Sequence, residues 1–151
     1  MRAALLLIAV VLYGCTANPE QSVSEGKDVR LQLGLAYLAQ GKLKLAHPHL
    51  QTALKNNPQS LDANLALGQW YLSTNDVDSA LSLYQQALSW QPMSGALYNN
   101  YAVALCVAGD WKTALTYFDK VRLDSKYRHH DRARKNRAEC LARGSHDAAQ
   151  P

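Results

Sequence analysis

Three cysteines are the residues in this sequence whose chemistry depends most on where the fold places them. Cys15 ends an apolar stretch near the N-terminus, whereas Cys106 and Cys140 lie in the second half of the chain. A free cysteine packs like a small apolar side chain, and paired cysteines form disulfides in oxidising compartments. The roles of these three residues therefore depend on the compartment and on the elements that carry them.

Histidines are the other residues with metal-binding or catalytic potential. His47 and His49 flank Pro48, and His129 is adjacent to His130, but neither pair has a carboxylate or cysteine at metal-ligand spacing. The sequence contains no glycine-rich phosphate loop, nucleophile motif or pair of catalytic carboxylates. It therefore predicts no metal, no cofactor, no small-molecule substrate and no enzymatic activity.

The N-terminus has the composition of an export signal. Met1 and Arg2 precede an unbroken apolar run from Ala3 to Tyr13. This run is shorter than the about 20 residues that a membrane-spanning helix requires. We expect a signal peptide over residues 1–14 and a polar, flexible tether over residues 15–26.

The end of this run, Leu12-Tyr13-Gly14-Cys15, resembles the lipobox of bacterial lipoproteins, in which cleavage leaves the cysteine as a lipid-bearing first residue. Thr16 follows, where an aspartate would favour retention in the inner membrane. The resemblance implies lipidation of Cys15, palmitate included, and an address on the periplasmic face of the outer membrane. An ordinary signal peptide with a chance cysteine is the alternative.

Small and bulky apolar residues recur along the rest of the chain with a period of about 34 residues. Counted from residues 27, 61 and 95, the eighth and twentieth positions are small, and the twenty-fourth is bulky. Small residues allow two helices to approach closely beside a large side chain. The residues that carry the pattern are Gly34, Ala46 and Leu50, then Gly68, Ala80 and Tyr84, then Ala102, Ala114 and Phe118.

This pattern resembles the tetratricopeptide repeat, a hairpin of two antiparallel helices. The resemblance implies an all-α solenoid of three helical hairpins plus a C-terminal capping helix. We expect the repeat domain over residues 27–144 and a disordered tail over 145–151. Its predicted repeats are 27–60, 61–94, 95–128 and the half-repeat 129–144.

Cys106 and Cys140 both occupy the twelfth position of their repeats. If the protein is exported, a disulfide between them persists. Packed helix axes lie about 8–10 Å apart, whereas a disulfide requires Cα atoms within about 4.4–6.8 Å. The last helix must therefore lean in or shift register, and two buried free thiols are the alternative.

A narrower resemblance follows from the run Leu97 to Cys106, which contains Asn99-Asn100-Tyr101-Ala102, and from the run Tyr127 to Cys140. Both resemble the PilF/PilW family of type IV pilus lipoproteins, whose members carry an Asn-Asn-Tyr-Gly motif leading to one cysteine and a second cysteine in the next repeat. Ala102 replaces the glycine of the motif. Members usually continue through further repeats beyond the half-repeat present here.

The resemblance to PilF/PilW implies a pilotin. Such a protein is an outer-membrane-anchored periplasmic adaptor that binds secretin subunits and promotes their targeting and multimer assembly for type IV pilus biogenesis. The alternative is a structural tetratricopeptide-repeat lipoprotein that scaffolds a Tad-type pilus or other envelope or cell-wall machinery.

The first helices of tetratricopeptide repeats line a concave face, which in this sequence is mostly apolar. Such a groove suits an amphipathic helix or an extended apolar peptide. The alternative is that these side chains form core packing. The predicted partner-binding residues, at the fifth, ninth and twelfth positions, are Leu31, Leu35, Leu38, Leu65, Gln69, Leu72, Asn99 and Val103.

Positive charge is concentrated near the C-terminus. The chain carries a formal charge of +4, and Arg122 to Arg143 contains eight Lys or Arg against three acidic residues. Export to the periplasm argues against a nucleic-acid partner. We expect a solvated capping helix, with an acidic partner or lipid headgroups as the alternatives.

Overall fold

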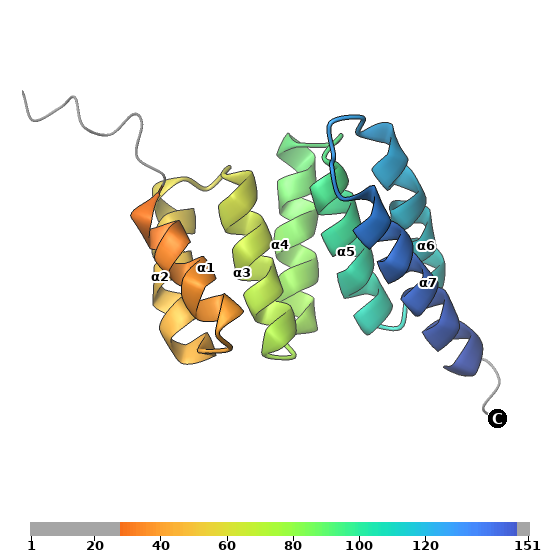
Figure 1. Ribbon diagram of the computed structural model, residues 1–151, viewed down its shortest axis with the longest axis horizontal. Helices are drawn as coiled ribbons and strands as arrows, with labels where there is room; N and C mark the ends of the chain where they lie inside the picture. The colour runs from red at the N-terminus through yellow and green to blue at the C-terminus, as the bar shows by residue number, and fades with distance from the viewer. Residues whose placement is uncertain (1–27, 148–151) are drawn as a thin grey trace, which may run out of the picture.

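The computed structural model describes residues 28–147. Within this range the chain forms seven α-helices and one short 3-10 helix, η1, packed in consecutive pairs (Figure 1). The predicted signal peptide and the whole of the predicted tether, Cys15 included, lie outside the described residues. The elements are α1 (Val29–Ala39), α2 (Leu43–Asn56), α3 (Leu61–Ser73), α4 (Val77–Trp90), α5 (Gly95–Val107), α6 (Trp111–Lys120), η1 (Val121–Leu123) and α7 (His130–Asp147).

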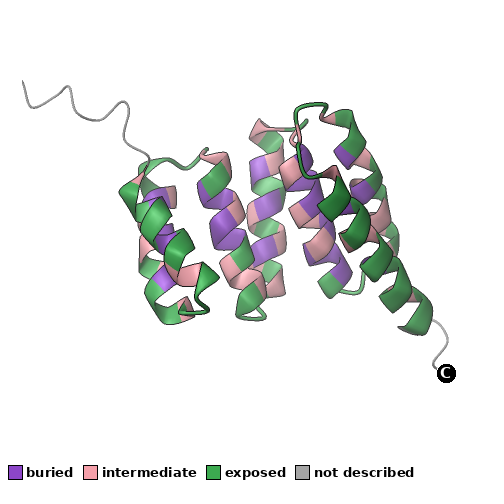
Figure 2. Ribbon diagram, in the orientation of Figure 1, coloured by how far each residue is buried: buried purple, intermediate pink, exposed green. Residues whose placement is uncertain are grey.

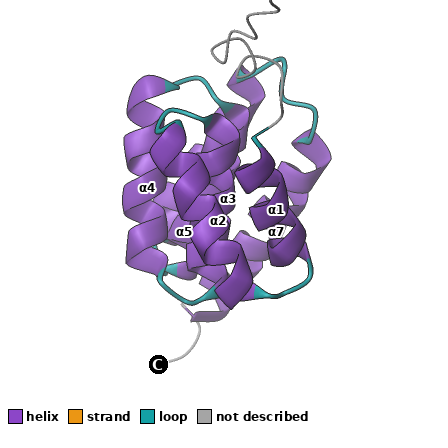
Figure 3. Ribbon diagram, turned by 90° about the vertical axis from the view of Figure 1, so that its left-hand side faces the viewer, coloured by secondary structure: helices purple, strands orange, loops and turns teal. Residues whose placement is uncertain are grey.

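The predicted all-α solenoid of three hairpins with a final helix is confirmed. Helices α1 and α2, α3 and α4, and α5 and α6 form successive hairpins, and α7 packs against α5 and α6. Buried residues concentrate on α3, α4 and α5 in the middle of the stack, whereas α7 is largely exposed (Figure 2). The view from the α1 and α2 end shows helices joined by loops throughout the described range (Figure 3). Within that range, no helix combines the length and apolar character needed to cross a membrane.

Each hairpin closes where a small residue of its first helix meets a large side chain of its second. A Cβ atom added to Gly34 would lie 2.5 Å from Leu50 Cδ2, and one added to Gly68 would lie 2.3 Å from the ring of Tyr84. These distances are too short for a methyl group. The eighth position is therefore small because the helices touch there, as the spacing predicts.

The turn inside each hairpin repeats the same backbone conformation. Gly41, Asn75 and Gly109 have φ values of 68°, 61° and 85°, which is the left-handed region that favours glycine and tolerates asparagine. Asp76 and Asp110 then accept hydrogen bonds from backbone N–H groups in the first turns of α4 and α6. These caps stabilise the start of the second helices.

The loops between hairpins are held by side chains at the fourth repeat position. Asn64 Nδ2 donates to the carbonyl oxygens of Pro58, at 2.9 Å, and Ser60, at 2.8 Å. Tyr98 Oη donates to the carbonyl oxygen of Pro92. The carbonyl oxygens of Pro58 and Pro92 thereby gain hydrogen-bond partners, so each proline-containing loop is fixed to the helix that follows it.

The third such loop uses a carboxylate instead. Asp124 accepts a hydrogen bond from the Gly95 N–H at 2.8 Å and another from the Lys126 N–H at 3.0 Å. The bond from Gly95 is the main reason that the pKa of Asp124 lies below its usual value. The Tyr127 side chain then covers Gly95. The start of α5 is thereby attached to the loop that leads to α7.

Helix α7 extends further than the sequence predicts. It runs through Gly144 and Ser145 to Asp147, so the predicted tail begins inside a helix, and its last four residues lie outside the described part. A Cβ added to Gly144 would lie 2.8 Å from Trp111 Cγ. Gly144 is thus a site of close packing against α6, which explains why this glycine does not end the helix.

Candidate functional site

The first helices α1, α3 and α5 each carry one predicted groove residue at the ninth repeat position. These residues are Leu35, Gln69 and Val103, which recur one repeat apart. Leu35 and Gln69 are exposed, and Val103 is half-buried. Successive hairpins stack in the same orientation (Figure 1), so the ninth position recurs at the same place in each hairpin.

The fifth position is occupied differently from the prediction. Leu31 is 6% exposed and Asn99 is 3% exposed. Leu31 belongs to a core cluster with Ala63 and Leu67 of α3, and Asn99 Oδ1 accepts a hydrogen bond from Asn136 Nδ2 of α7 at 3.0 Å. The fifth position therefore lies where one first helix meets the next, and these two residues act in packing between repeats.

The remaining predicted groove residues have an intermediate role. Leu38 packs against the core cluster of the first hairpin, while Leu65 and Leu72 pack against the cluster that contains Tyr84. All three leucines are half-buried. A charge placed on any of them would therefore disturb the packing of the hairpins.

The cysteine pair lies where α7 packs against α5. A disulfide joins Cys106 of α5 to Cys140 of α7, and their Cα atoms are 5.7 Å apart. Helix α7 crosses its neighbours at an angle (Figure 1). This tilt brings the two Cα atoms within the distance that a disulfide requires, as expected if the last helix leans towards α5. The disulfide ties the last helix to the third hairpin.

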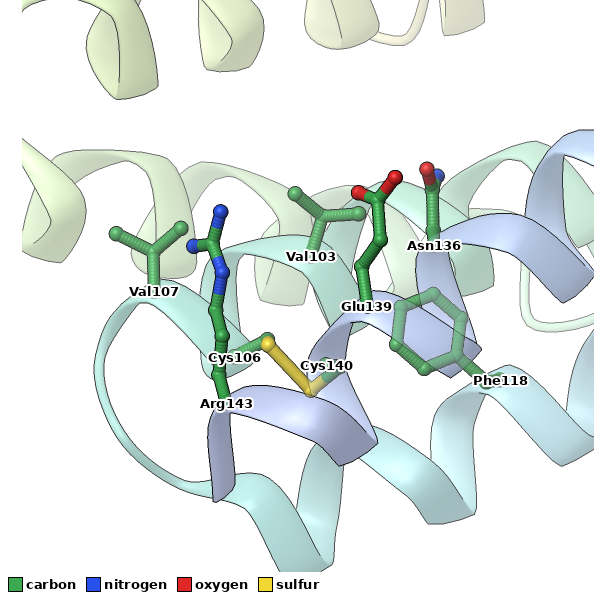
Figure 4. Close-up of a pocket in the computed structure, with 8 residues that line it drawn as sticks. All are labelled: Val103, Cys106, Val107, Phe118, Asn136, Glu139, Cys140 and Arg143. Atoms are coloured by element: carbon green, nitrogen blue, oxygen red, sulfur yellow. A yellow bond between two sulfur atoms is a disulfide. The ribbon is translucent and has the colours of Figure 1, made fainter. Parts of the chain in front are cut away.

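A small pocket of about 70 Å³ lies over this disulfide. Val103 and Val107 of α5 stand on one side, and Glu139 and Arg143 of α7 stand on the other, with the sulfur atoms between them (Figure 4). The pocket continues the ninth-position line, because Val103 belongs to both. The groove thus changes from an apolar surface at Leu35 to a mixed polar and apolar surface at α7.

Three contributors to this surface were missed by the sequence analysis. Val107 is 44% exposed at the thirteenth repeat position, and the repeat spacing alone would have located it. The sequence predicts a solvated capping helix that contains Glu139 and Arg143, and no spacing signal distinguishes them from their charged neighbours. Their place beside the pocket depends on the tilt of α7.

The side chain of Trp70 joins the first two hairpins through contacts that the sequence does not indicate. Trp70 Nε1 donates to the Leu43 carbonyl oxygen at 2.8 Å, and the Trp70 ring stacks on His47 with centroids 3.9 Å apart. His47 therefore has a packing role. Among residues 28–147, no three His, Cys, Asp or Glu side chains are grouped closely enough to hold a metal ion.

Comparison with known proteins identifies the class. Residues 31–92 and 71–127 match the tetratricopeptide repeat. Together these matches cover more than half of the chain, and the chain therefore belongs to the tetratricopeptide-repeat family, whose stacked helical hairpins serve as scaffolds for protein–protein interactions.

Within this class, the chain is related to pilus biogenesis factors. It is 34% identical over 109 residues to the type IV pilus assembly protein PilF of Pseudomonas aeruginosa, covering 67% of this chain and 43% of that protein. It is also 22% identical over 126 residues to an uncharacterized protein of Haemophilus influenzae, covering 82% of this chain and 70% of that one.

Two solved structures have the same arrangement of helices. The structure of Pseudomonas aeruginosa PilF superposes with a TM-score of 0.70 at 27% identity, covering 77% of this chain and 52% of that chain. The structure of PilW, a widely conserved type IV pilus biogenesis factor, superposes with a TM-score of 0.72 at 28% identity, covering 79% and 55%. The chain thus spans about half the length of these relatives.

Proposed function

We propose that this protein is a pilotin-like adaptor of the cell envelope. A lipid on Cys15 anchors it to the periplasmic face of the outer membrane. The repeat groove binds secretin subunits and promotes their targeting to that membrane and their multimer assembly for type IV pilus biogenesis. The observation that carries the proposal is the relationship to PilF, at 34% identity over 109 residues.

The groove supports a protein as the ligand. Its open line runs across three stacked helices from Leu35 through Gln69 to Val103, and half-buried leucines form its floor. A surface of this length and apolar character is complementary to the apolar face of an amphipathic helix. The ninth-position residues are the contacts that we propose for the partner.

The chain supplies a matched pair of variants to test the groove. Leu35 and Leu33 are both 37% exposed and both lie on α1, but Leu35 belongs to the groove and Leu33 to the end of the solenoid. Leu35→Glu should weaken capture of the purified periplasmic region of the cognate secretin by more than about tenfold, as expected for a central interface side chain. Leu33→Glu should bind like the wild type.

Binding would be measured by calorimetry, and circular dichroism would verify that both variants keep their helical content. Equal binding by the two variants would remove the groove from the proposal. Equal loss in both would indicate that the solenoid end, and not the groove, contacts the secretin.

The anchor is tested separately, because Cys15 lies outside the described residues. Cys15→Ser should move the protein from the outer-membrane fraction to the soluble periplasmic fraction, since several acyl chains are needed for stable anchoring. Unchanged fractionation would refute lipid anchoring while leaving the groove intact.

Deletion of the protein tests the adaptor role in the cell. The secretin should then fail to accumulate as heat-stable multimers in the outer membrane, and wild-type protein supplied in trans should restore them. Normal multimers in the deletion strain would instead favour scaffolding of a Tad-type pilus or of other envelope machinery.

A further inference from the structure

A second cavity lies on the other side of Phe118 from the disulfide pocket. It is a cleft of about 260 Å³ between α6 with η1 and the N-terminal half of α7. Phe118 lines both spaces, and none of the predicted groove residues lines the cleft. The lining residues are Phe118, Asp119, Val121, Arg122, His130, Ala133, Arg134 and Arg137.

Helix periodicity explains why α7 brings cations to this cleft. His130, Ala133, Arg134 and Arg137 follow the spacing i, i+3, i+4 and i+7, which places them on one face of a helix. Ala133 is 5% exposed, so this face is directed towards α6 and η1. Two arginines and a histidine therefore flank a small residue that allows close packing.

The cleft holds more positive than negative charge. Arg122, Arg134 and Arg137 line it, and Asp119 is its single acidic lining residue within the described part of the chain. Asp119 Oδ1 accepts from Arg137 Nε at 3.0 Å, and the Asp119 carbonyl oxygen accepts from Arg122 Nε at 3.2 Å. Both bonds use Nε, so they orient the two guanidinium groups while leaving the terminal nitrogens of each fork for a ligand.

Arg134 pairs with Asp131, a highly exposed carboxylate on the same helix. Such a surface pair is weak and exchanges readily with a competing anion. The α7 N-terminus, which begins at His130, adds the positive end of a helix dipole. The oriented guanidinium groups, the weak surface ion pair and the helix dipole all favour an anionic ligand.

The arginines are the groups that a ligand in the cleft contacts. Phe118 and Val121 line the cleft but are only 5% and 2% exposed. A peptide that carries several carboxylates can pair with more than one of the arginines at once. Guanidinium forks also match carboxylates in a two-bond geometry.

We propose that the cleft between α6, η1 and α7 is a second interaction surface, which binds an acidic peptide segment of a partner protein. Carboxylates of the segment pair with Arg122, Arg134 and Arg137. This surface is independent of the groove proposed for the secretin.

The test measures binding of a fluorescently labelled peptide, Glu-Glu-Leu-Glu-Glu, to the disulfide-intact protein by anisotropy at low salt. The peptide Gln-Gln-Leu-Gln-Gln is the uncharged comparison. The variant Arg122→Gln/Arg137→Gln should weaken binding of the acidic peptide by about tenfold or more, because two charge-assisted hydrogen-bonding groups are lost.

The control variant Arg128→Gln/Arg132→Gln removes the same charge from two exposed residues that do not line the cleft, and should change binding by less than about threefold. Arg122→Gln alone leaves the Arg137–Asp119 pair intact, and should weaken binding even if the double variant unfolds. Equal losses in the cleft and control variants would overturn the proposal, because the binding would then be general electrostatic attraction.

Two further arms distinguish other anions. Inorganic phosphate should not displace the acidic peptide when the protein is saturated with the peptide. Vesicles of phosphatidylglycerol should not bind more weakly to the cleft variant than to the control variant. Either effect would replace the peptide with a phosphate-bearing ligand. Leu35→Glu should leave peptide binding unchanged, which separates this result from that of the groove.

Discussion

The two ends of the solenoid expose the same repeat positions but present opposite surfaces. At the third position, Val29 of α1 is 75% exposed, whereas its counterpart in α3, Ala63, is fully buried. In α7 this position is Asp131, which is exposed. The first end is therefore an uncovered apolar face, and the last described helix presents charge.

The seventh position shows the same contrast. Leu67 of α3 is 4% exposed because the preceding hairpin covers it, while Leu33 of α1 is 37% exposed. The equivalent residue of α7, Lys135, is exposed and lies within 3.9 Å of Glu139. The contribution of a residue to the stability of a repeat protein thus depends on whether a neighbouring repeat covers it, and not on residue type alone.

The ends also differ in how they are held. α7 is joined to α5 by a disulfide and by the hydrogen bond between Asn99 and Asn136. α1 depends on packing around Gly34 and on its cap, in which Asp28 accepts from the Arg30 N–H at 2.9 Å. A polar helix with few buried side chains gains most from a covalent link, and this explains why the link occurs at the charged end.

The largest expected effect is loss of the disulfide. Cys106→Ala/Cys140→Ala should lower the free energy of unfolding by about 3–4 kcal/mol, because the bridge closes a loop of one repeat in the unfolded chain. Urea denaturation measures the change, and hydrogen exchange should rise first in α7. Reduced wild-type protein should behave like the variant. Unchanged stability in both would show that packing alone holds the helix.

The next largest effect is expected at the seventh repeat position, which is buried in α3 and exposed in α1. Leu67→Ala should destabilise the protein by about 3 kcal/mol, since it opens a cavity between two hairpins. Leu33→Ala, its exposed counterpart, should cost less than about 1 kcal/mol. The measurement is urea denaturation of both variants. Similar costs at the two positions would mean that the first hairpin is covered in solution.

A smaller effect is expected on the pH dependence of folding stability. The hydrogen bond from the Gly95 N–H lowers the pKa of Asp124 in the folded state, so its stabilisation is present above the unfolded pKa of about 3.9 and is lost as the pH falls through the folded value. Asp124→Asn should therefore lose less stability than the wild type between pH 6 and pH 3. Thermal unfolding at each pH tests this, and parallel curves would contradict it.

The smallest effect on stability is expected at the open end. Val29→Lys should change the free energy of unfolding by less than about 0.5 kcal/mol, because this side chain is 75% exposed and no residue of the described part of the chain covers it. It should also reduce any self-association of the apolar end, measured by sedimentation. A large destabilisation would show that Val29 packs against another part of the chain.

Much of the fold could be predicted from residues that act locally. The small residues Gly34 and Gly68 indicate where paired helices touch, and Gly41, Asn75 and Gly109 mark the turns. Each of these roles follows from steric limits within a single hairpin. The period then repeats the hairpin along the chain, so the fold class required no tertiary information.

The exposure of the predicted groove residues follows the repeat pattern only in part. At the ninth position Leu35 and Gln69 are exposed and Val103 is half-buried. At the fifth position Leu31 and Asn99 are buried between first helices. The repeat pattern assigns a position to a face of its own helix. It does not contain the distance to the next helix, which determines whether that face is open.

The sequence by itself determined the helical hairpins, their turns and their order, because close helix contact and left-handed turn conformations restrict which residues are allowed locally. Only the tertiary structure decided how α7 leans on α5 and α6. That tilt depends on non-local contacts, among them Gly144 against Trp111 and Ala133 against the third hairpin. It brings the two cysteines together, adds Glu139 and Arg143 to the end of the groove, and forms the basic cleft on the other side of Phe118.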